Sequence, residues 1–204
     1  SFPTRRSSDL RVLQVLDESI ELDKAYRGQV LEYNQKKKEI YRLQGNKSAY
    51  IEQLWKLVLE QSAGDLDIYK ELKAQYSEKE WLIKREELFK KLPANAHIDR
   101  LYKEEKLYDR LLAYVLKSSG LYAVQSYENV LKKEYPKQIL SKYQGEVNKM
   151  ASCTGNRKHY ADLVALLRRM KQIKGGSEIV ETIVEEWKIK YRNRPAMMDE
   201  LSKL

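Results

Sequence analysis

The chain has 204 residues, of which 34% are charged and 42% apolar, with 39 Lys and Arg against 30 Asp and Glu. This apolar content is enough for a core and excludes intrinsic disorder, while 8 Gly and 4 Pro are too few for the hairpins of an all-β protein. A single Cys excludes a disulfide framework and Cys-rich zinc sites, and no apolar run approaches the ~20 residues that span a bilayer. We therefore expect a soluble, cytoplasmic, largely helical protein without membrane contact.

The first ten residues differ from the rest. Residues 1–10 are rich in Ser and Arg, show no helical period and lack the apolar stretch of a secretory signal. A transit peptide is one interpretation. The nucleotide string TCT TTC CCT ACA CGA CGC TCT TCC GAT CT also encodes the segment and looks like a sequencing adapter read as coding sequence. We interpret residues 1–10 as a non-native artefact. We expect the natural protein to continue upstream, so that the cut leaves apolar surface bare near Arg11–Leu43.

From Arg11 onward, apolar residues recur at intervals of three and four, which forms one apolar face on a helix. In chain order these stripes are Tyr50, Ile51, Leu54, Trp55 and Val58; Leu107, Tyr108, Leu111, Leu112 and Val115; Tyr160, Leu163, Val164, Leu167, Met170 and Ile173; and Ile179, Val180, Ile183, Val184, Trp187 and Tyr191. No stretch alternates with a period of two, so no strand is predicted. The sequence predicts an all-α stack of antiparallel helical hairpins, either α-solenoid-like or an irregular helical repeat, because no fixed sequence period is present.

Short polar breaks separate the predicted helices. Left-handed stops followed by cap residues are expected at Gly45-Asn46, Gly64-Asp65, Ser119-Gly120, Thr154-Gly155-Asn156 and Gly175-Gly176-Ser177. Ser77 and Glu80 fit a capping box, and Pro195 suits the first turn of a last short helix. The breaks yield roughly a dozen helices with short connections. We assign them to N-terminal hairpins at 11–93 and C-terminal hairpins at 94–204, continuous with the first set.

Two features that could carry chemistry have simpler interpretations. Cys153 and His159 are six residues apart, but two ligands cannot hold a tetrahedral zinc and nothing marks the thiol as a nucleophile. Gly175-Gly176 precedes a helix but lacks the spacing of a phosphate-binding loop, so it is interpreted as a turn. We therefore predict no catalytic residue and no metal ligand here.

Carboxylates are abundant and interleaved with basic residues. Glu104, Glu105 and Asp109 fall in what we interpret as one helix, with Lys106 and Arg110 beside them. The spacing predicts solvated faces with weak ion pairs rather than a paired acid and base, which would require burial. The chain is accordingly predicted not to be an enzyme.

Basic residues are concentrated toward the C-terminus. Between Asn156 and Arg194, ten Lys and Arg stand against five carboxylates, so this segment carries more than half of the net charge of +9. Such a face is a candidate for anion or nucleic-acid contact, although no recognised nucleic-acid-binding motif accompanies it. The candidate contact residues are Arg157, Lys158, Arg168, Arg169, Lys171, Lys174, Arg192 and Arg194.

The segment from Asn156 to Leu204 has the most distinctive pattern. It comprises Arg157-x-x-Tyr160, then Leu166-Leu167-Arg168-Arg169-Met170, then Gly175-Gly176 before an Ile/Val helix, then Trp187, Tyr191 and Arg192-Asn193-Arg194-Pro195-Ala196-Met197-Met198-Asp199-Glu200-Leu201. This resembles the C-terminal end of bacterial SWIM zinc finger family proteins. The upstream helices are compatible with the helical region that such proteins carry.

The resemblance implies a fragment of a longer protein. The zinc site of the family, Cys-x-Cys…Cys-x-His, lies nearer the N-terminus, and Cys153 matches no member of it. Zinc is then expected only in a missing upstream module, and no cofactor is expected in this fragment. The resemblance implies a non-enzymatic helical scaffold that binds an unidentified protein partner; nucleic-acid binding through the basic face at 156–194 is the alternative.

Overall fold

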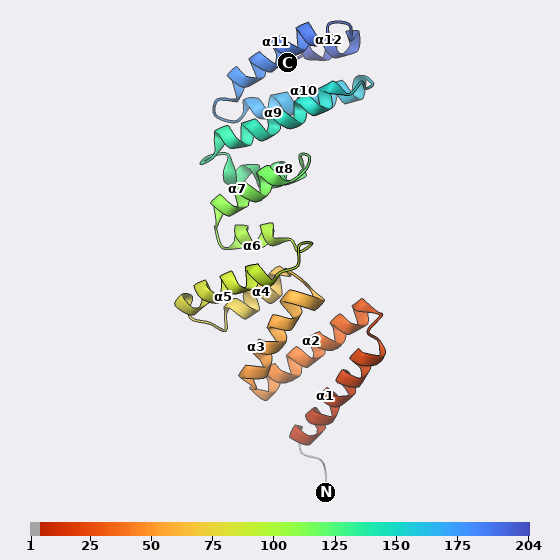
Figure 1. The fold of residues 1–204 in the computed structure, drawn as a ribbon, viewed down its shortest axis with the longest axis vertical. Helices are drawn as coiled ribbons and strands as arrows, with labels where there is room; N and C mark the ends of the chain where they lie inside the picture. The colour runs from red at the N-terminus through yellow and green to blue at the C-terminus, as the bar shows by residue number, and fades with distance from the viewer. Residues whose placement is uncertain (1–4) are drawn as a thin grey trace. The chain divides into compact units, whose positions relative to one another are not determined.

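The computed structural model describes residues 5–204, which form twelve α-helices and one short π-helix, with no strand among them (Figure 1). The predicted all-α class is confirmed. Contacts divide the chain into two units, the first ending at Glu105 and the second spanning Lys106–Leu204. The sequence alone suggested a division between 93 and 94.

Unit 1 consists of α1 (Arg5–Leu22), α2 (Arg27–Gln44), α3 (Lys47–Lys56), the π-helix η1 (Leu57–Gln61), α4 (Leu66–Lys73), α5 (Glu78–Lys91) and α6 (Ile98–Glu104). Consecutive helices α1, α2 and α3 pack in pairs, and α4 packs against α3 and α6. The buried core between α3 and α6 comprises Leu54, Leu57, Val58, Ile68, Tyr69, Leu72, Trp81, Leu88 and Leu101. Two members of the stripe predicted at 50–58, Leu54 and Val58, are fully buried.

Unit 2 consists of α7 (Tyr108–Lys117), α8 (Tyr122–Leu131), α9 (Pro136–Ser152), α10 (Arg157–Lys171), α11 (Gly176–Lys190) and α12 (Pro195–Leu201). Each helix from α7 to α10 packs against the next one in sequence. In addition, α9 contacts both α7 and α11, and α10 contacts α12 (Figure 1). Contacts to the next helix and to the one after it are the packing that a stack of antiparallel hairpins predicts.

The predicted helix boundaries are confirmed at several caps. Gly45 ends α2 in the left-handed region at φ 67°, and the Asn46 side chain then accepts a hydrogen bond from Ala49 N at 3.2 Å. The same arrangement recurs at Gly64, which has φ 75°, and at Asp65, whose side chain accepts a hydrogen bond from Ile68 N. At the start of α5, Ser77 and Glu80 form the predicted capping box.

The start of α11 differs from the prediction. The helix begins at Gly176 with Gly175 as its N-cap residue in the left-handed region at φ 84°, so Ser177 lies inside the helix and caps nothing. Gly176 is required by a close approach, because a Cβ atom on it would lie 1.8 Å from Met170 O. The double glycine therefore serves packing between α10 and α11.

Residues 1–10, interpreted as an adapter artefact, are described only in part. Residues 1–4 lie outside the described residues, and α1 begins at Arg5. The apolar face that holds α1 on α2 starts later, with the buried side chains of Leu13 and Leu16. The described part of the segment thus extends a helix whose packing residues belong to the following sequence.

Candidate functional site

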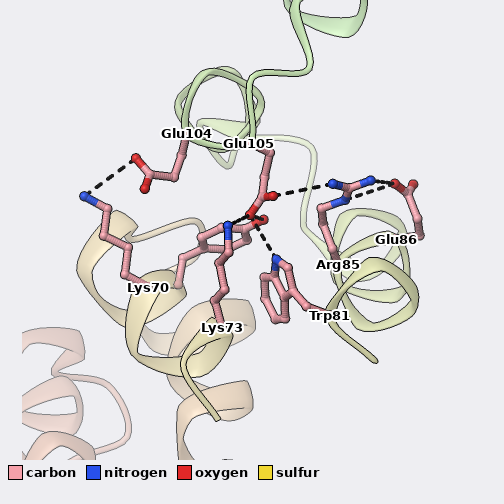
Figure 2. Close-up of polar contacts among 8 residues, drawn as sticks. Lys70, Lys73, Trp81, Arg85, Glu86, Glu104 and Glu105 are labelled. Carbon is pink, nitrogen blue, oxygen red and sulfur yellow. Dashed lines mark hydrogen bonds and ion pairs between the residues drawn. The ribbon is translucent and has the colours of Figure 1, made fainter. Parts of the chain in front are cut away.

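A buried carboxylate at the end of α6 gathers side chains from α4 and α5 (Figure 2). The Glu105 side chain is 6% exposed, and its Oε1 accepts hydrogen bonds from the Tyr69 hydroxyl at 2.9 Å, Trp81 Nε1 at 2.9 Å and Lys73 Nζ at 3.0 Å. Arg85 Nη1 lies 3.4 Å from Oε2. These five residues are called the Glu105 cluster, and they join three helices of unit 1 through one carboxylate.

The prediction that Glu105 lies on a solvated helix face is wrong. Helix α6 ends at Glu104 and α7 begins at Tyr108, so Glu105 and Asp109 share no helix. Lys106 adopts φ 56°, in the left-handed region that few residues other than glycine enter. The chain turns there without a Gly or Pro, and Glu105 is buried against α4 and α5.

The surroundings of Glu105 and Tyr69 determine the protonation state of each side chain. Burial by itself would raise the pKa of Glu105, but hydrogen bonds from Trp81, Lys73 and Tyr69 together outweigh burial and lower that pKa below its usual range. Burial and the adjacent carboxylate raise the pKa of the Tyr69 hydroxyl. At neutral pH the carboxylate is charged and the phenol protonated, so neither exchanges a proton readily. The cluster is suited to holding helices together and unsuited to acid–base catalysis.

This lowered pKa predicts how the stability of unit 1 depends on pH. Because the folded-state pKa of Glu105 lies below its unfolded value, the carboxylate stabilises the fold above the unfolded value near 4.5, and this contribution is lost as pH falls through the folded-state pKa. We expect the difference in unfolding free energy between the wild type and Glu105→Gln to be constant at neutral pH and to shrink below about pH 4.5. Urea titrations at a series of pH values measure it. A difference that grows on acidification would contradict the assignment.

Two further ion pairs lie at the edge of the cluster (Figure 2). Lys70 Nζ is 3.6 Å from Glu104 Oε2, and Arg85 Nη2 is 3.2 Å from Glu86 Oε1. Lys70 is half exposed and Glu104 one-third exposed, so their pair contributes little to stability. The adjacent glutamates 104 and 105 therefore differ sharply in their surroundings.

The eight basic residues predicted for anion or nucleic-acid contact do not form a single cluster. Arg157 and Lys158 begin α10, whereas Arg168, Arg169 and Lys171 lie in its last turns and Lys174 follows it. A helix of 15 residues is about 22 Å long. Arg192 and Arg194 follow α11 and lie near the α10 start, since Arg194 Nη1 donates to Ala151 O, just before that start, at 2.7 Å. The structure thus separates the predicted face into two groups at opposite ends of α10.

Most of these basic residues already have partners within unit 2. Arg157 pairs with Asp199 and, at 2.9 Å, with Glu200. Lys158 pairs with Asp162 at 2.9 Å, and Arg168 Nη2 donates to Lys203 O at 2.8 Å. These contacts connect α10 to α12 or stay within α10. They neutralise part of the charge that suggested the face.

Arg169 has the most buried carboxylate partner of the eight. Its Nε donates to Glu128 Oε2 at 2.7 Å, and the Glu128 side chain is almost completely buried. The pair connects α8 to α10. Of the eight residues, Lys171, Lys174 and Arg192 are the ones whose side chains make no hydrogen bond or ion pair with the residues that the structure describes.

Cys153 and His159 have different surroundings. Cys153 is exposed after α9, while His159 Nε2 lies 3.0 Å from Met150 O and is occupied by that contact. Residues 5–204 contain no group of three or more His, Cys, Asp or Glu placed to hold a metal ion.

Helix α1 exposes several apolar side chains in unit 1. Val12, Val15 and Leu22 are 47%, 52% and 82% exposed, whereas Leu13 and Leu16 of the same helix are buried. We call Val12, Val15, Ser19 and Leu22 the α1 seam. A groove of about 430 Å³ borders it, lined by Ser7, Ser8, Arg11, Val12, Val15 and Leu16. Tyr26 and Leu43 nearby are also exposed, so the apolar surface expected near residues 11–43 is present.

A second hollow in unit 1 has a polar lining. It has a volume of about 500 Å³ and lies beside α3 and η1. Its lining includes four charged side chains together with Trp55 and Leu59: Lys37, Glu52, Lys56 and Glu60. Lys37 already pairs with Asp17 at 2.6 Å. Charges of both signs without a buried, unpartnered polar group give this hollow no preference for one ligand class.

Comparison with known proteins finds no match: no family model, no curated protein and no solved structure is similar to this chain. None of the helices in residues 5–204 is both long enough and apolar enough to cross a membrane.

Proposed function

We propose that this chain is a non-enzymatic helical scaffold that binds another protein chain through the α1 seam. The observation that carries the proposal is the row of exposed Val12, Val15 and Leu22 on α1. Apolar patches of this kind on soluble proteins are typical of interaction sites. Helices that expose an apolar row are also a common mode of partner recognition.

The polar clusters support a scaffold over an enzyme. The buried carboxylate of Glu105 is saturated with donors, and that of Glu128 is paired with Arg169. Catalytic carboxylates need a pKa near the working pH and room for a substrate. Glu105 instead has a lowered pKa and contacts from three side chains on one oxygen. Both glutamates therefore fit a role in joining helices.

Nucleic-acid binding through residues 156–194 is the alternative. The contacts that these basic residues make support it less than their number along the sequence does. A continuous basic surface favours binding to phosphates. Here Arg157, Lys158 and Arg169 are paired with carboxylates, and the predicted face is divided between the two ends of α10. The resemblance to the SWIM family, and the zinc module that it implies upstream, stay predictions.

Photocrosslinking tests the interaction surface. We expect a photoreactive residue introduced at Val15 to form covalent adducts of discrete mass with protein in cells. The same residue at Ile189 of α11, which is 76% exposed in the other unit, serves as the matched control and should form few. Both sites are apolar and exposed, so a difference in adduct yield between them reports a binding surface rather than nonspecific hydrophobic binding. Equal yields at the two positions would contradict the proposal.

A further inference from the structure

We infer that a row of lysines at one edge of unit 2 binds the phosphate backbone of a nucleic-acid duplex without contacting its bases. The row consists of Lys132, Lys133 and Lys137 around the turn between α8 and α9, and of Lys171 and Lys174 around the turn between α10 and α11. We call these five residues the lysine rim. The inference goes beyond the proposed function, because it concerns unit 2 and does not depend on the α1 seam.

The fold brings the two turns of the lysine rim together. Helix α9 packs against α8, α10 and α11, and α10 packs against α11. The turn between α10 and α11 lies near the start of α9, because a Cβ atom on Gly176 would be 3.3 Å from Leu140 Cδ2. Both turns are therefore at the same edge of unit 2 (Figure 1). Since packed helices are about 8–10 Å apart, the lysines of the two turns form one row.

The rim lysines have no partners of their own. In the part of the chain that the structure describes, none of their side chains makes a hydrogen bond or an ion pair. Lys133, Lys137 and Lys174 are exposed, and Lys132 and Lys171 are half-buried. Three of the five precede the segment 156–194, so the count of charge along that segment did not include them. The structure thus assembles a different set of basic residues from the one that the sequence suggested.

The carboxylates around the lysine rim leave it positively charged. Over the two turns and the start of α7, that is residues 106–110, 128–140 and 168–181, nine Lys and Arg stand against five Asp and Glu, which gives a net charge of +4. One of these carboxylates, Glu128, is already paired with Arg169. Glu134 and Glu178 are exposed within the turns themselves. Two carboxylates are too few to neutralise five lysines.

The position of Lys137 is unfavourable for the isolated fold. It lies in the first turn of α9, which contains no acidic residue. The start of a helix carries a partial positive charge, so a cation there is repelled, whereas Lys132 and Lys171 lie at helix ends that attract cations. A bound anion would offset the repulsion at Lys137. Helix stability therefore explains two of the rim lysines and leaves Lys137 to be explained by a ligand.

The chemistry of the lysine rim favours phosphates over protein or lipid. Lys is depleted in protein–protein interfaces, where Arg and aromatic side chains supply the anchors. Among the described residues, no large apolar side chain is exposed in either turn, so the rim has nothing to insert into a bilayer. Lysine point charges bind a phosphate backbone without such anchors.

The lack of an exposed aromatic side chain favours a duplex over a single strand. Surfaces that bind single strands stack the bases on aromatic rings. Tyr135, the aromatic residue of the two turns, is half-buried. Partial burial and the charges of Glu134 and Asp109 raise the pKa of its hydroxyl, so two carboxylates lie near the ring and oppose a stacked nucleotide. In a duplex the bases are already paired, and only the backbone has to reach the rim.

Fluorescence anisotropy with a labelled 20-base-pair DNA duplex of mixed sequence tests the inference. We expect the 204-residue chain to bind it with a dissociation constant of about 1–100 μM at ~150 mM salt, and log K to fall against log salt with a slope of about −4.5 if all five lysines neutralise a phosphate. Lys137→Ala with Lys174→Ala removes one lysine from each turn. This double variant should bind about tenfold or more weakly, with a slope reduced by about 2.

Two lysines at the other end of α11 provide the matched control. Lys188 and Lys190 are exposed, so Lys188→Ala with Lys190→Ala changes the net charge equally and should leave the affinity within about twofold of the wild type. Circular dichroism checks that both double variants fold. Equal weakening by the two double variants overturns the inference, because net charge alone would then account for binding.

Other ligands complete the test. A chain that does not bind the duplex at about 50 mM salt overturns the inference. Rim-dependent binding of polyglutamate, or of vesicles containing phosphatidylserine, without binding of the duplex would assign the lysines to an acidic protein or a lipid surface and overturns it as well. Tighter binding of a single strand than of the duplex overturns the choice of a duplex. None of these results bears on crosslinking at Val15, which tests unit 1.

Discussion

Replacing Glu105 with Ala is expected to lower the free energy of unfolding of unit 1 by about 3–5 kcal/mol. The change removes the acceptor of Tyr69, Trp81 and Lys73 together. Arg85, which is itself mostly buried, keeps only its pair with the more exposed Glu86. The buried Tyr69 hydroxyl and Trp81 N–H lose their acceptor altogether, and such donors cost more than the original hydrogen bonds contribute, because they have lost water without gaining a partner. Urea denaturation followed by tryptophan fluorescence measures the loss.

The neighbouring glutamate provides a matched control. Glu104 pairs with Lys70 at 3.6 Å in a setting open to solvent, so Glu104→Ala should change the free energy of unfolding by no more than about 0.5 kcal/mol. Both substitutions remove one carboxylate from the same end of α6 and change the net charge equally. Equal losses in the two variants would mean that the Glu105 cluster does not hold α4, α5 and α6 together.

The second large effect is expected at Gly176. A methyl group there would lie 1.8 Å from Met170 O and 2.7 Å from Met170 C, both backbone atoms. The turn between α10 and α11 cannot relieve this contact by rotating a side chain, so the two helices must separate. We expect Gly176→Ala to lower the free energy of unfolding of unit 2 by about 3 kcal/mol, to be measured by thermal denaturation.

Gly145 supplies the comparison for that change. It lies inside α9, and a Cβ atom on it would meet nothing within 4 Å. Alanine has a higher helix propensity, so Gly145→Ala should raise stability by about 1 kcal/mol. The two Gly→Ala substitutions are then expected to have opposite signs in the same unit. A tolerated Gly176→Ala would show that α11 does not approach the end of α10 so closely.

Local features of the fold could be predicted from the sequence because their causes are local. A glycine stop followed by a capping side chain, as at Gly45 and Asn46, needs only neighbouring residues. The capping box at Ser77 and the apolar stripes are of the same kind. The prediction that Ser177 caps α11 was wrong because the start of that helix does not depend on neighbouring residues alone. It depends on how closely Gly176 approaches Met170.

The polar sites depended on contacts between distant residues and could not be predicted. Glu105 has the same local spacing as a surface glutamate, and its burial depends on a left-handed turn at Lys106 that no glycine marks. The basic face was predicted by counting charge along the chain. A count of charges does not show which carboxylates these residues meet in the fold. Arg169, for example, pairs with Glu128, which lies 41 residues away in the sequence.

The exposed thiol of Cys153 has a practical consequence for work with the chain in solution. It is the sole cysteine of the sequence, so each molecule can form one intermolecular disulfide. Air oxidation is therefore expected to link molecules in covalent pairs and no further. Sedimentation before and after the addition of a reductant should show a dimer that disappears when the disulfide is reduced.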